Sequence, residues 1–309
     1  MIFDGAADNR AFVKMQTFEV GDPPNVSDTF VRAYTRNPYT GRSLWFMSDP
    51  PHGMKKWRNV LANPKRNLMR DGKHLWWKHI VELYDEDMKS QGLTRLHKLS
   101  LRHIRPSNWD RMNVRVAAQT LSNSVALQLT FKIMAGAHYL TATRDFVQMS
   151  NDLFDLINSH TFINCDTMTP VFLDMRAKLD WFLAGVHTQD EKKWLASKTL
   201  FDMQMMVEGF IGYATDFFEV YKGPGEALAP GLFNQDALEN FFGCIRARGC
   251  QNTNPDEAQY GYSLQRSVVS QNASLEIKTA KGNSGHSTTR QELKRKANIQ
   301  APIRPEKGK

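Results

Sequence analysis

Two carboxylates in this chain stand at the edges of apolar runs, where acidic side chains can bind metal ions. Asp4 follows the short apolar stretch MIF and precedes Gly5, whereas Glu239 lies far downstream in NQDALENFFGCIRARG. A strand-end aspartate and a helix-borne glutamate that converge in space can hold two Mg²⁺ ions about 4 Å apart. Such ions activate a water or a 3′-hydroxyl for phosphodiester chemistry, and Mg²⁺ keeps coordination positions open for substrate phosphates.

Each acid also has an ordinary structural explanation. Asp-Gly after a strand is a turn sequence. Glu239 follows Asp236 by three residues, which is the capping-box spacing, and Asn234 is a second cap candidate. The two residues by themselves therefore leave both interpretations open.

The amino-terminal elements expected to position Asp4 are of α/β type. MIF and SLWFM (43–47) are typical of short buried strands, a helix is expected over 9–19, and 21–38 is expected to be mostly loop. Asp49-Pro50-Pro51 ends the second apolar run, and Pro51 suits the first turn of a helix.

The middle of the chain is expected to be almost entirely α-helical. Its apolar residues recur every three or four positions, as in Val171, Met175, Leu179 and Phe182. The expected helices cover 76–90, 109–135, 143–159, 170–185 and 191–221. A capped helix over 234–249 follows, and the polar composition after Val268 predicts disorder. The fold class is therefore a helix-rich α/β protein in which an all-α block separates two α/β pieces.

The net charge of +8 is unevenly distributed. Residues 266–309 contain ten Lys or Arg against three Asp or Glu, so the tail supplies nearly all of it. In the rest of the chain, basic residues are concentrated between Lys55 and Lys78, where Trp57, Trp76 and Trp77 lie among them. This segment suits a groove that follows a nucleic-acid backbone, and it equally suits a solvated helix face with core tryptophans.

Several classes of protein are disfavoured by the sequence. No apolar stretch approaches the ~20 residues of a membrane span, and the N-terminus lacks the pattern of a signal peptide. The three cysteines contain no CxxC pair, which favours a reduced compartment and no zinc site.

Five motifs occur in an order that resembles one known family. They are FDGAADNRAF, SDPPHGMKKWRNVL, MNVRVAAQTLSNSVALQL, NDLFDLINS and QDALENFFGCIRARG. Together they resemble the core of P-element-type transposases and of transposase-like proteins that carry an N-terminal THAP zinc finger. The similarity covers roughly residues 2–265.

The resemblance implies a partial RNase H-like domain of the metal-dependent Asp/Asp/Glu type, interrupted by a helical insertion that binds GTP. Its domains would be 1–70 and 231–265 for the RNase H-like parts, 71–230 for the insertion and 266–309 for a disordered basic tail. In this family GTP is a cofactor for assembly on DNA. Homo-oligomerisation on transposon ends and target DNA in the nucleus is expected, with no membrane partner.

The resemblance also assigns roles to residues. Asp4 resembles the second catalytic aspartate and Glu239 the catalytic glutamate, both as Mg²⁺ ligands. Asp236 resembles a contact to guanine, whose N1–H and amine a carboxylate can accept. The chain has no GxxxxGK[ST] loop, so nucleotide must be bound without a P-loop. Further candidates for the nucleotide pocket are Arg111, Val114, Asp152, Asp155 and Asn158.

The candidates for DNA contact are cationic. Arg246 and Arg248 lie on the helix of Glu239 and suit either phosphate or nearby acids. Lys55, Lys56 and Arg58 come from the basic concentration. In the SDPPHG motif, Asp49 is expected to cap or hydrogen-bond rather than to bind metal as an auxiliary ligand. His52 suits either the DNA backbone or a buried position.

The resemblance leads to one expectation about activity. In the family, three earlier strands and the first catalytic aspartate precede the position of Met1, as does the THAP finger. The chain as written is therefore expected to be an N-terminally truncated, catalytically incompetent transposase. The alternatives are a domesticated remnant that binds DNA, nucleotide or protein, and a purely helical interaction protein.

Overall fold

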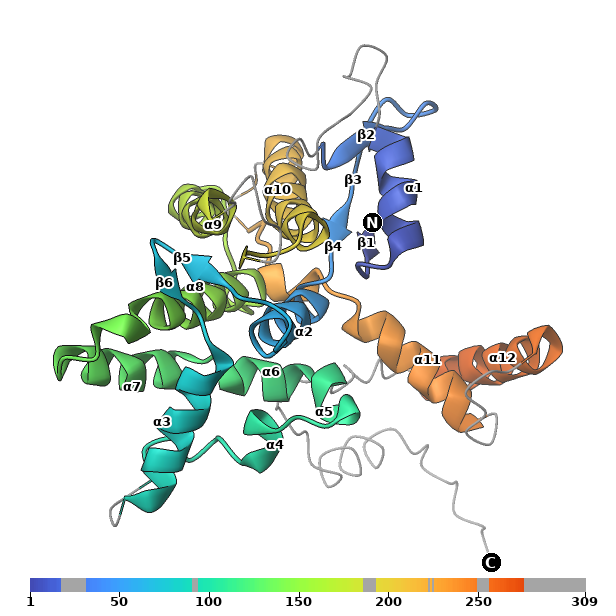
Figure 1. The fold of residues 1–309 in the computed structure, drawn as a ribbon. Helices are drawn as coiled ribbons and strands as arrows, with labels where there is room; N and C mark the ends of the chain where they lie inside the picture. Colours follow the sequence, from blue (N-terminus) through green and yellow to red (C-terminus); the bar gives the residue numbers. More distant parts are fainter. Residues whose placement is uncertain are drawn as a thin grey trace, which may run out of the picture. The chain divides into compact units, whose positions relative to one another are not determined.

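The computed structural model describes residues 1–17, 32–90, 94–185, 193–221, 223, 225–248 and 256–274 (Figure 1). The chain forms two compact units, Met1–Gln235 and Asp236–Lys309. Each unit is described by itself. None of the helices in the described ranges is both long and apolar enough to cross a membrane.

Both strands expected near the N-terminus are confirmed. Strand β1 (Ile2–Phe3) pairs in parallel with β4 (Met47–Ser48), and β3 (Ser43–Trp45) pairs antiparallel with β2 (Tyr34–Arg36). Strand β2 lies within the stretch expected to be mostly loop. The rings of Tyr34 and Trp45 lie 4.9 Å apart at a tilted angle, and such aromatic cross-strand contacts stabilise a sheet.

Helix α1 (Ala7–Thr17) follows β1 directly and packs on the strands. Its only buried residue is Val13, which joins Phe3, Phe46, Phe201 and Met205 in a small apolar cluster. The expected end of this helix at Glu19 lies outside the described residues, as does most of the loop predicted after it.

Helix α2 (Pro50–Leu61) begins where the sequence predicted. The carboxylate of Asp49 accepts a hydrogen bond from the His52 N–H, and two prolines occupy the first turn. Pro is tolerated there because the first N–H groups of a helix have no partner within it. The buried residues Met54, Trp57 and Leu61 face the core.

A hairpin and a helix follow α2. Strands β5 (Met69–Arg70) and β6 (Lys73–His74) pair around Asp71-Gly72, which has positive φ angles, and α3 (Trp77–Lys89) begins soon after. This helix confirms the helical pattern over 76–90.

The single helix expected over 109–135 is instead three helices. They are α5 (Asn108–Met112), α6 (Val114–Thr120) and α7 (Asn123–Met134), preceded by the short α4 (Leu101–Ile104). The side chain of Asn113 accepts a hydrogen bond from the Val116 N–H and thereby starts a new helix. Polar cap residues inside an apolar period end one helix and begin the next.

The last three helices of the first unit are α8 (Thr141–Ile157), α9 (Met168–Ala184) and α10 (Ser197–Val220), with 3₁₀ turns η1 (His138–Leu140) and η3 (Pro230–Leu232) nearby. Helix α10 packs against β4. The Met-rich part of α10 belongs to the core, since Met203, Met205 and Met206 are buried.

Two glycines let α10 approach the strands closely. A Cβ at Gly209 would lie 2.1 Å from the carbonyl oxygen of Phe46, and one at Gly212 would lie 2.1 Å from the ring of Trp45. One apolar core extends from Met47 to Phe218 and includes residues of both the strand region and the helical block. The boundary predicted at 70/71 thus falls inside one compact unit.

The second unit contains α11 (Asp236–Arg248) and α12 (Glu257–Ser274). The helix expected over 234–249 is confirmed. The rings of Phe242 and Tyr260, 6.5 Å apart, connect the two helices. Helix α12 continues past Val268, where disorder was expected, and the rest of the basic tail lies outside the described residues.

Candidate functional site

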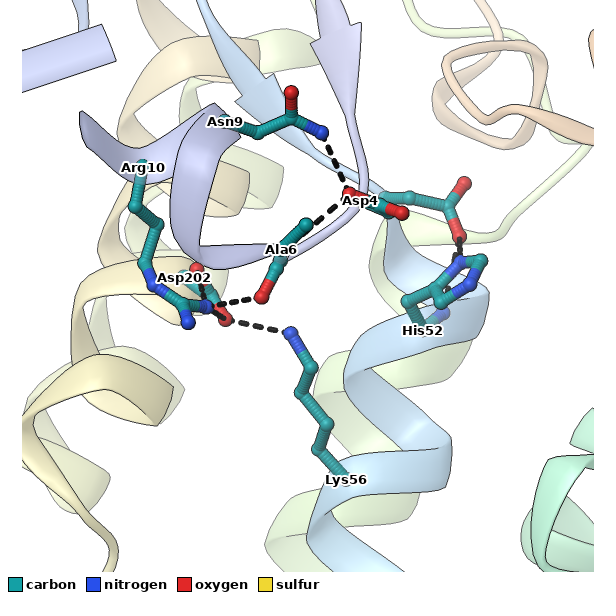
Figure 2. A network of polar contacts seen from close by, with 9 residues as sticks. Asp4, Ala6, Asn9, Arg10, His52, Lys56 and Asp202 are labelled. Atoms are coloured by element: carbon teal, nitrogen blue, oxygen red, sulfur yellow. Dashed lines mark hydrogen bonds and ion pairs between the residues drawn. The ribbon is translucent and has the colours of Figure 1, made fainter. Parts of the chain in front are cut away.

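Asp4 lies at the carboxyl end of β1, in the turn that leads into α1 (Figure 2). One of its oxygens, Oδ1, accepts hydrogen bonds from the Ala6 N–H at 3.0 Å and from the Asn9 side-chain amide at 2.6 Å. No described residue donates to Oδ2. The carboxylate is therefore oriented through one oxygen and open at the other.

The electrostatic surroundings keep Asp4 ionised. Burial raises the pKa of its carboxyl, but the hydrogen bonds from Ala6 and Asn9 and the positive charges of His52 and Lys56 lower it by more. The net pKa lies below the ordinary value of 3.8. An open, anionic oxygen at neutral pH is what a metal ion requires of a ligand.

A buried ion network lies directly beneath the Asp4-Gly5 turn. The carboxylate of Asp202, on α10, binds Lys56 Nζ at 2.7 Å and Arg10 Nη1 at 3.1 Å (Figure 2). Arg10 also donates to the carbonyl oxygen of Gly5. A Cβ at Gly5 would meet the ends of the Lys56 and Asp202 side chains, so a larger residue in this turn would have to displace the network.

Asp202 was not among the site residues predicted from the sequence. It lies in the run FDMQMM, whose other residues are mostly apolar. An acid inside a buried apolar run is itself a signal, because a charge can be buried at tolerable cost only when it is paired. That signal predicts a cation partner, but the identity of Lys56 and Arg10 required the fold.

Asp49 has the structural role that the sequence analysis favoured. It is 1% exposed, and its Oδ2 accepts from the His52 N–H at 3.0 Å and lies 2.7 Å from His52 Nδ1. Its other oxygen accepts from the Gln235 N–H at 2.8 Å. Both oxygens are thus used within the protein, which leaves Asp49 unsuited to an auxiliary metal role, and His52 is held half-buried beside it.

Gln235 is the residue at which the chain returns to this end of the strands. Besides its bond to Asp49, its side-chain amide donates to the Ile2 carbonyl at 3.4 Å. Gln235 is the last residue of the first unit and directly precedes α11. A segment more than two hundred residues after Asp4 is therefore fixed to the strand that carries it.

The residues fit part of the expected magnesium site. Asp4 offers the open oxygen described above, and carboxylate oxygen is the ligand type that Mg²⁺ prefers. No group of three or more acidic, His or Cys side chains that could hold a metal occurs among the described residues. Glu239 is exposed in the first turn of α11, in the other unit, so its distance from Asp4 stays a prediction.

Asp152 and Asp155 lie near the carboxyl end of α8 and share one partner. The side-chain amide of Asn151 donates to Asp155 Oδ2 at 2.8 Å and to Asp152 Oδ1 at 3.4 Å, and Gln148 donates to Asp152 at 2.7 Å. Asn151 in turn accepts from the Asn123 N–H at the start of α7. Neither acid has a cation partner among the described residues.

Asp155 is the strained member of this pair. Although Asp155 is exposed, partial desolvation of its carboxyl raises the pKa above the ordinary 3.8. The hydrogen bond from Asn151 lowers this pKa, and the charge of Asp152 raises it further. Perturbed carboxylates without a cation are typical of functional sites. Asn158 lies just beyond, as the residue that ends α8.

The other two nucleotide candidates lie on different helices. Arg111 is exposed on α5, and its carbonyl accepts from the Asn59 side chain at 3.2 Å. Val114 begins α6 and is buried. Within the described ranges no hydrogen bond or ion pair joins them to Asp152 or Asp155, so a shared pocket stays a prediction.

The structure corrects one residue of the predicted DNA-binding set. Arg58 is fully buried, and its guanidinium donates to the Asp110 carbonyl at 2.9 Å and to Asn59 at 2.8 Å. Burial first, and the nearby Arg111 charge second, lower its pKa to about 10, while Asp110 raises it. Arg58 therefore stabilises the packing of α2 on α5, and a direct contact with DNA does not fit this position.

The remaining DNA candidates differ in exposure. Lys55 and Lys56 are half-buried, and Lys56 is bound to Asp202. Arg246 is exposed on α11, whereas the side chain of Arg248 lies outside what is described. Asp236 is in the first turn of the same helix.

Comparison with protein families identifies two matching models. The GTP-binding insertion domain of TNP-like proteins matches residues 51–170, and the C-terminal RNase H domain of TNP-like proteins matches residues 232–261. The first match begins within α2, ahead of the insertion boundary expected at residue 71.

One known protein and one solved structure that resemble this chain are both P element transposases. The transposable element P transposase of Drosophila melanogaster is 26% identical over 237 residues, which are 73% of this chain and 30% of that protein. The Drosophila P element transposase strand transfer complex matches with a TM-score of 0.70 and 22% identity, covering 88% of this chain and 60% of that one. The chain thus spans less than two thirds of either relative, and the structural likeness establishes the fold.

Proposed function

The chain is a P-element-type transposase-like protein with a GTP-binding insertion domain, and from this premise we propose that it acts in DNA transposition. The proposed chemistry is the metal-dependent cleavage and joining of DNA strands, with a guanine nucleotide as the cofactor for assembly.

The attachment of Gln235 is the observation that supports this proposal most. The bonds from Gln235 to Asp49 and Ile2 hold the residue that directly precedes α11 at the end of the strand that carries Asp4. Glu239 follows one helical turn later. We infer that α11 brings Glu239 to the open oxygen of Asp4.

These two acids would hold Mg²⁺, and Asp4 is prepared for that role. The ion would activate the attacking hydroxyl and stabilise the leaving oxygen of the phosphodiester. In this chain, Ala6 and Asn9 orient Asp4, while Asp202 keeps Lys56 and Arg10 engaged beneath the turn. The cations are thereby kept from occupying the carboxylate.

The nucleotide is proposed to use the carboxylates of α8 for its sugar or base. Carboxylates accept hydrogen bonds from ribose hydroxyls and from the N–H groups of guanine, whereas they repel phosphates. Asp155, Asp152 and Asn158 therefore suit the nucleoside, and the cationic Arg111 suits the phosphates. Asp236 would read guanine from α11.

DNA is the proposed macromolecular partner, and the nucleus is the compartment in which chromosomal DNA is met. Arg246 on the exposed face of α11 is the proposed phosphate contact nearest to Glu239 in the sequence. Assembly of several copies on DNA is proposed from the family resemblance.

Thermal unfolding with nucleotides tests the central part of this proposal. At a GTP concentration of about 100 times Kd, the folded state should gain about 2.7 kcal/mol, and ATP should stabilise it much less. Asp236→Ala should reduce the GTP effect at least about tenfold in affinity, because a charged hydrogen bond to guanine is lost. Glu257→Ala, which removes an exposed acid from the first turn of α12, is the matched control.

Two results would contradict the nucleotide role. Absence of stabilisation by millimolar GTP would remove the nucleotide from the function and favour a remnant that binds DNA or protein alone. An equal loss for GTP and ATP in Asp236→Ala would exclude guanine recognition by this residue.

A further inference from the structure

Residues 95–115 form a second basic segment, which was not singled out from the sequence. It carries six Lys or Arg against the single acid Asp110. The cations are Arg95, Lys98, Arg102, Arg105, Arg111 and Arg115, and all six are exposed. Only Arg102 is in an ion pair among the described residues, and its partner is Asp110 at 2.7 Å.

This segment differs from the basic concentration between Lys55 and Lys78. There Arg58 is buried, Lys56 binds Asp202, and Arg70 donates to the Trp181 carbonyl and stacks on its ring at 3.9 Å. Those cations are used to hold the first unit together. Apart from Arg102, the cations of 95–115 have no ion pair among the described residues and are exposed to a partner.

The three short helices of the segment form one continuous surface. The apolar side chains of the turn before α4 and of the helices are buried, namely Leu96, Leu99, Ile104, Val114 and Val116, whereas the cations are exposed. The ion pair between Arg102 and Asp110 ties α4 to α5, and a 2.9 Å hydrogen bond between His103 Nε2 and Gln119 Oε1 ties α4 to α6. The three helices lie together beside α2 and α3 in Figure 1.

A large aromatic side chain stands among these cations. Trp109 on α5 is 86% exposed, and Met112 on the same helix is 66% exposed. Exposure of a tryptophan costs hydrophobic free energy that the fold does not recover. Such rings next to arginines are typical of surfaces on which nucleic-acid bases stack.

We propose that segment 95–115 is a DNA-binding surface of the insertion domain. The cations Arg95, Lys98, Arg105 and Arg115 bind backbone phosphates, and Trp109 stacks on an unpaired base at a DNA end or junction. The inference rests on the proposed function only in taking DNA as the partner. Six cations spread over the turn before α4 and the three helices that follow exceed what one triphosphate needs. Their uniform sign matches a polyanion.

Salt-dependent binding of fluorescent duplex DNA by the full chain tests the backbone contacts. The triple variant Arg95→Gln, Arg105→Gln, Arg115→Gln removes three cations that have no role in the predicted nucleotide site. Lys65→Gln, Lys73→Gln, Lys89→Gln removes three exposed lysines of the same unit and is the matched control. The basic tail is unchanged in all three proteins, so its contribution cancels.

The triple arginine variant should bind on the order of a hundredfold more weakly near 150 mM salt. Its slope of log affinity against log salt should fall by about 2.7, because each phosphate contact releases about 0.9 counterion. The lysine control should keep the wild-type slope to within a few tenths.

Trp109→Ala tests the stacking contact. It should leave duplex affinity and the salt slope unchanged while weakening binding to a duplex with a single-stranded overhang by about tenfold. A Trp109→Ala variant that binds the overhang DNA as tightly as the wild type does would refute the role of Trp109.

Three outcomes would overturn the proposal in distinguishable ways. A triple arginine variant with the wild-type slope would refute the surface although the chain binds DNA. Loss of GTP stabilisation without a change in slope would assign the arginines to nucleotide phosphates. A wild-type chain that binds no DNA would refute both this inference and the DNA part of the proposed function.

Discussion

The carboxylates of this protein differ in how many of their oxygens are bound by other residues of the chain. Asp202 is saturated by two cations, Asp49 uses both oxygens within the fold, and Asp4 keeps one oxygen open. Asp155 has only an amide donor and a like-charged neighbour, so its ionised form is disfavoured. The open and disfavoured carboxylates are the ones that suit ligands.

Asp155 gives a prediction about pH. Because its pKa is raised in the folded protein, stability is highest below the unfolded value of 3.8 and falls as pH rises through the folded pKa. Asp155→Asn should therefore be slightly more stable than the wild type at pH 7, with the difference vanishing towards pH 3. Urea unfolding at both pH values measures this, and GTP affinity should fall about tenfold.

A wild-type chain more stable than Asp155→Asn at pH 7 would contradict the strain assigned to this carboxylate. Asp174→Asn, an exposed acid paired with Lys178 on α9, serves as the control without strain.

At the scale of elements, α10 organises the strand end that carries Asp4. It packs on β4 through Gly209 and reaches α1 and α2 through Asp202. The turn at Asp4 is thus positioned by a helix almost two hundred residues later in the chain. Substitutions on α10 should therefore alter the position of the turn that carries Asp4.

Asp202→Ala should destabilise the first unit by about 2–3 kcal/mol. It leaves Lys56 and Arg10 adjacent and unpaired, and the loss is below that of a fully buried pair because Lys56 remains 30% exposed. Glu208→Ala on the same helix removes an exposed pair with Arg176 and should cost about 0.5 kcal/mol or less. If chemical denaturation gave the same loss of unfolding free energy for Asp202→Ala and Glu208→Ala, the ion network would not stabilise the first unit.

Gly209→Ala should cost about 1–3 kcal/mol or more, because the new methyl group meets the Phe46 carbonyl. Gly243→Ala on α11 meets no atom within 4 Å and should instead stabilise its helix by about 0.5–1 kcal/mol. Thermal unfolding followed by circular dichroism shows whether each variant is less or more stable than the wild type. A neutral Gly209→Ala would contradict the close packing of α10 on β4.

At the scale of the molecule, the residues of the proposed sites are divided between the two compact units. Asp4, Asp152 and Asp155 are in the first unit, whereas Asp236 and Glu239 are in the second. Both the metal site and the guanine site that we propose draw on both units. A nucleotide or a metal ion bound by residues of both would join them.

Glu239→Gln tests whether Glu239 belongs to the proposed metal site. With the amino-terminal strands of the family supplied on the same polypeptide, the variant should lose strand transfer at least about a hundredfold, since even a lost outer-shell partner of a metal costs 10- to 100-fold. DNA binding measured by fluorescence anisotropy should be unchanged. Glu257→Gln in the same unit is the control, and retained strand transfer in Glu239→Gln would exclude a metal role.

The sequence by itself determined the elements whose signals are local. Apolar periodicity located α3, α8, α9 and α10, and Asp49-Pro50-Pro51 located the start of α2. Ordered motifs identified the family resemblance, which the comparisons confirm. Helix capping and apolar periodicity depend on residues close together in the sequence, so they predict helices without knowledge of the fold. Periodicity alone failed over 109–135, where cap residues interrupt it.

Only the tertiary structure decided which charges are partnered. Asp202, Lys56 and Arg10 are separated by up to 192 residues, and Gln235 is 186 residues from Asp49. The same fold buries Arg58, predicted to bind DNA, and exposes the arginines of 95–115. Pairing and burial depend on where distant segments meet, and a lysine or arginine has the same letter whether it binds a buried carboxylate or faces a ligand.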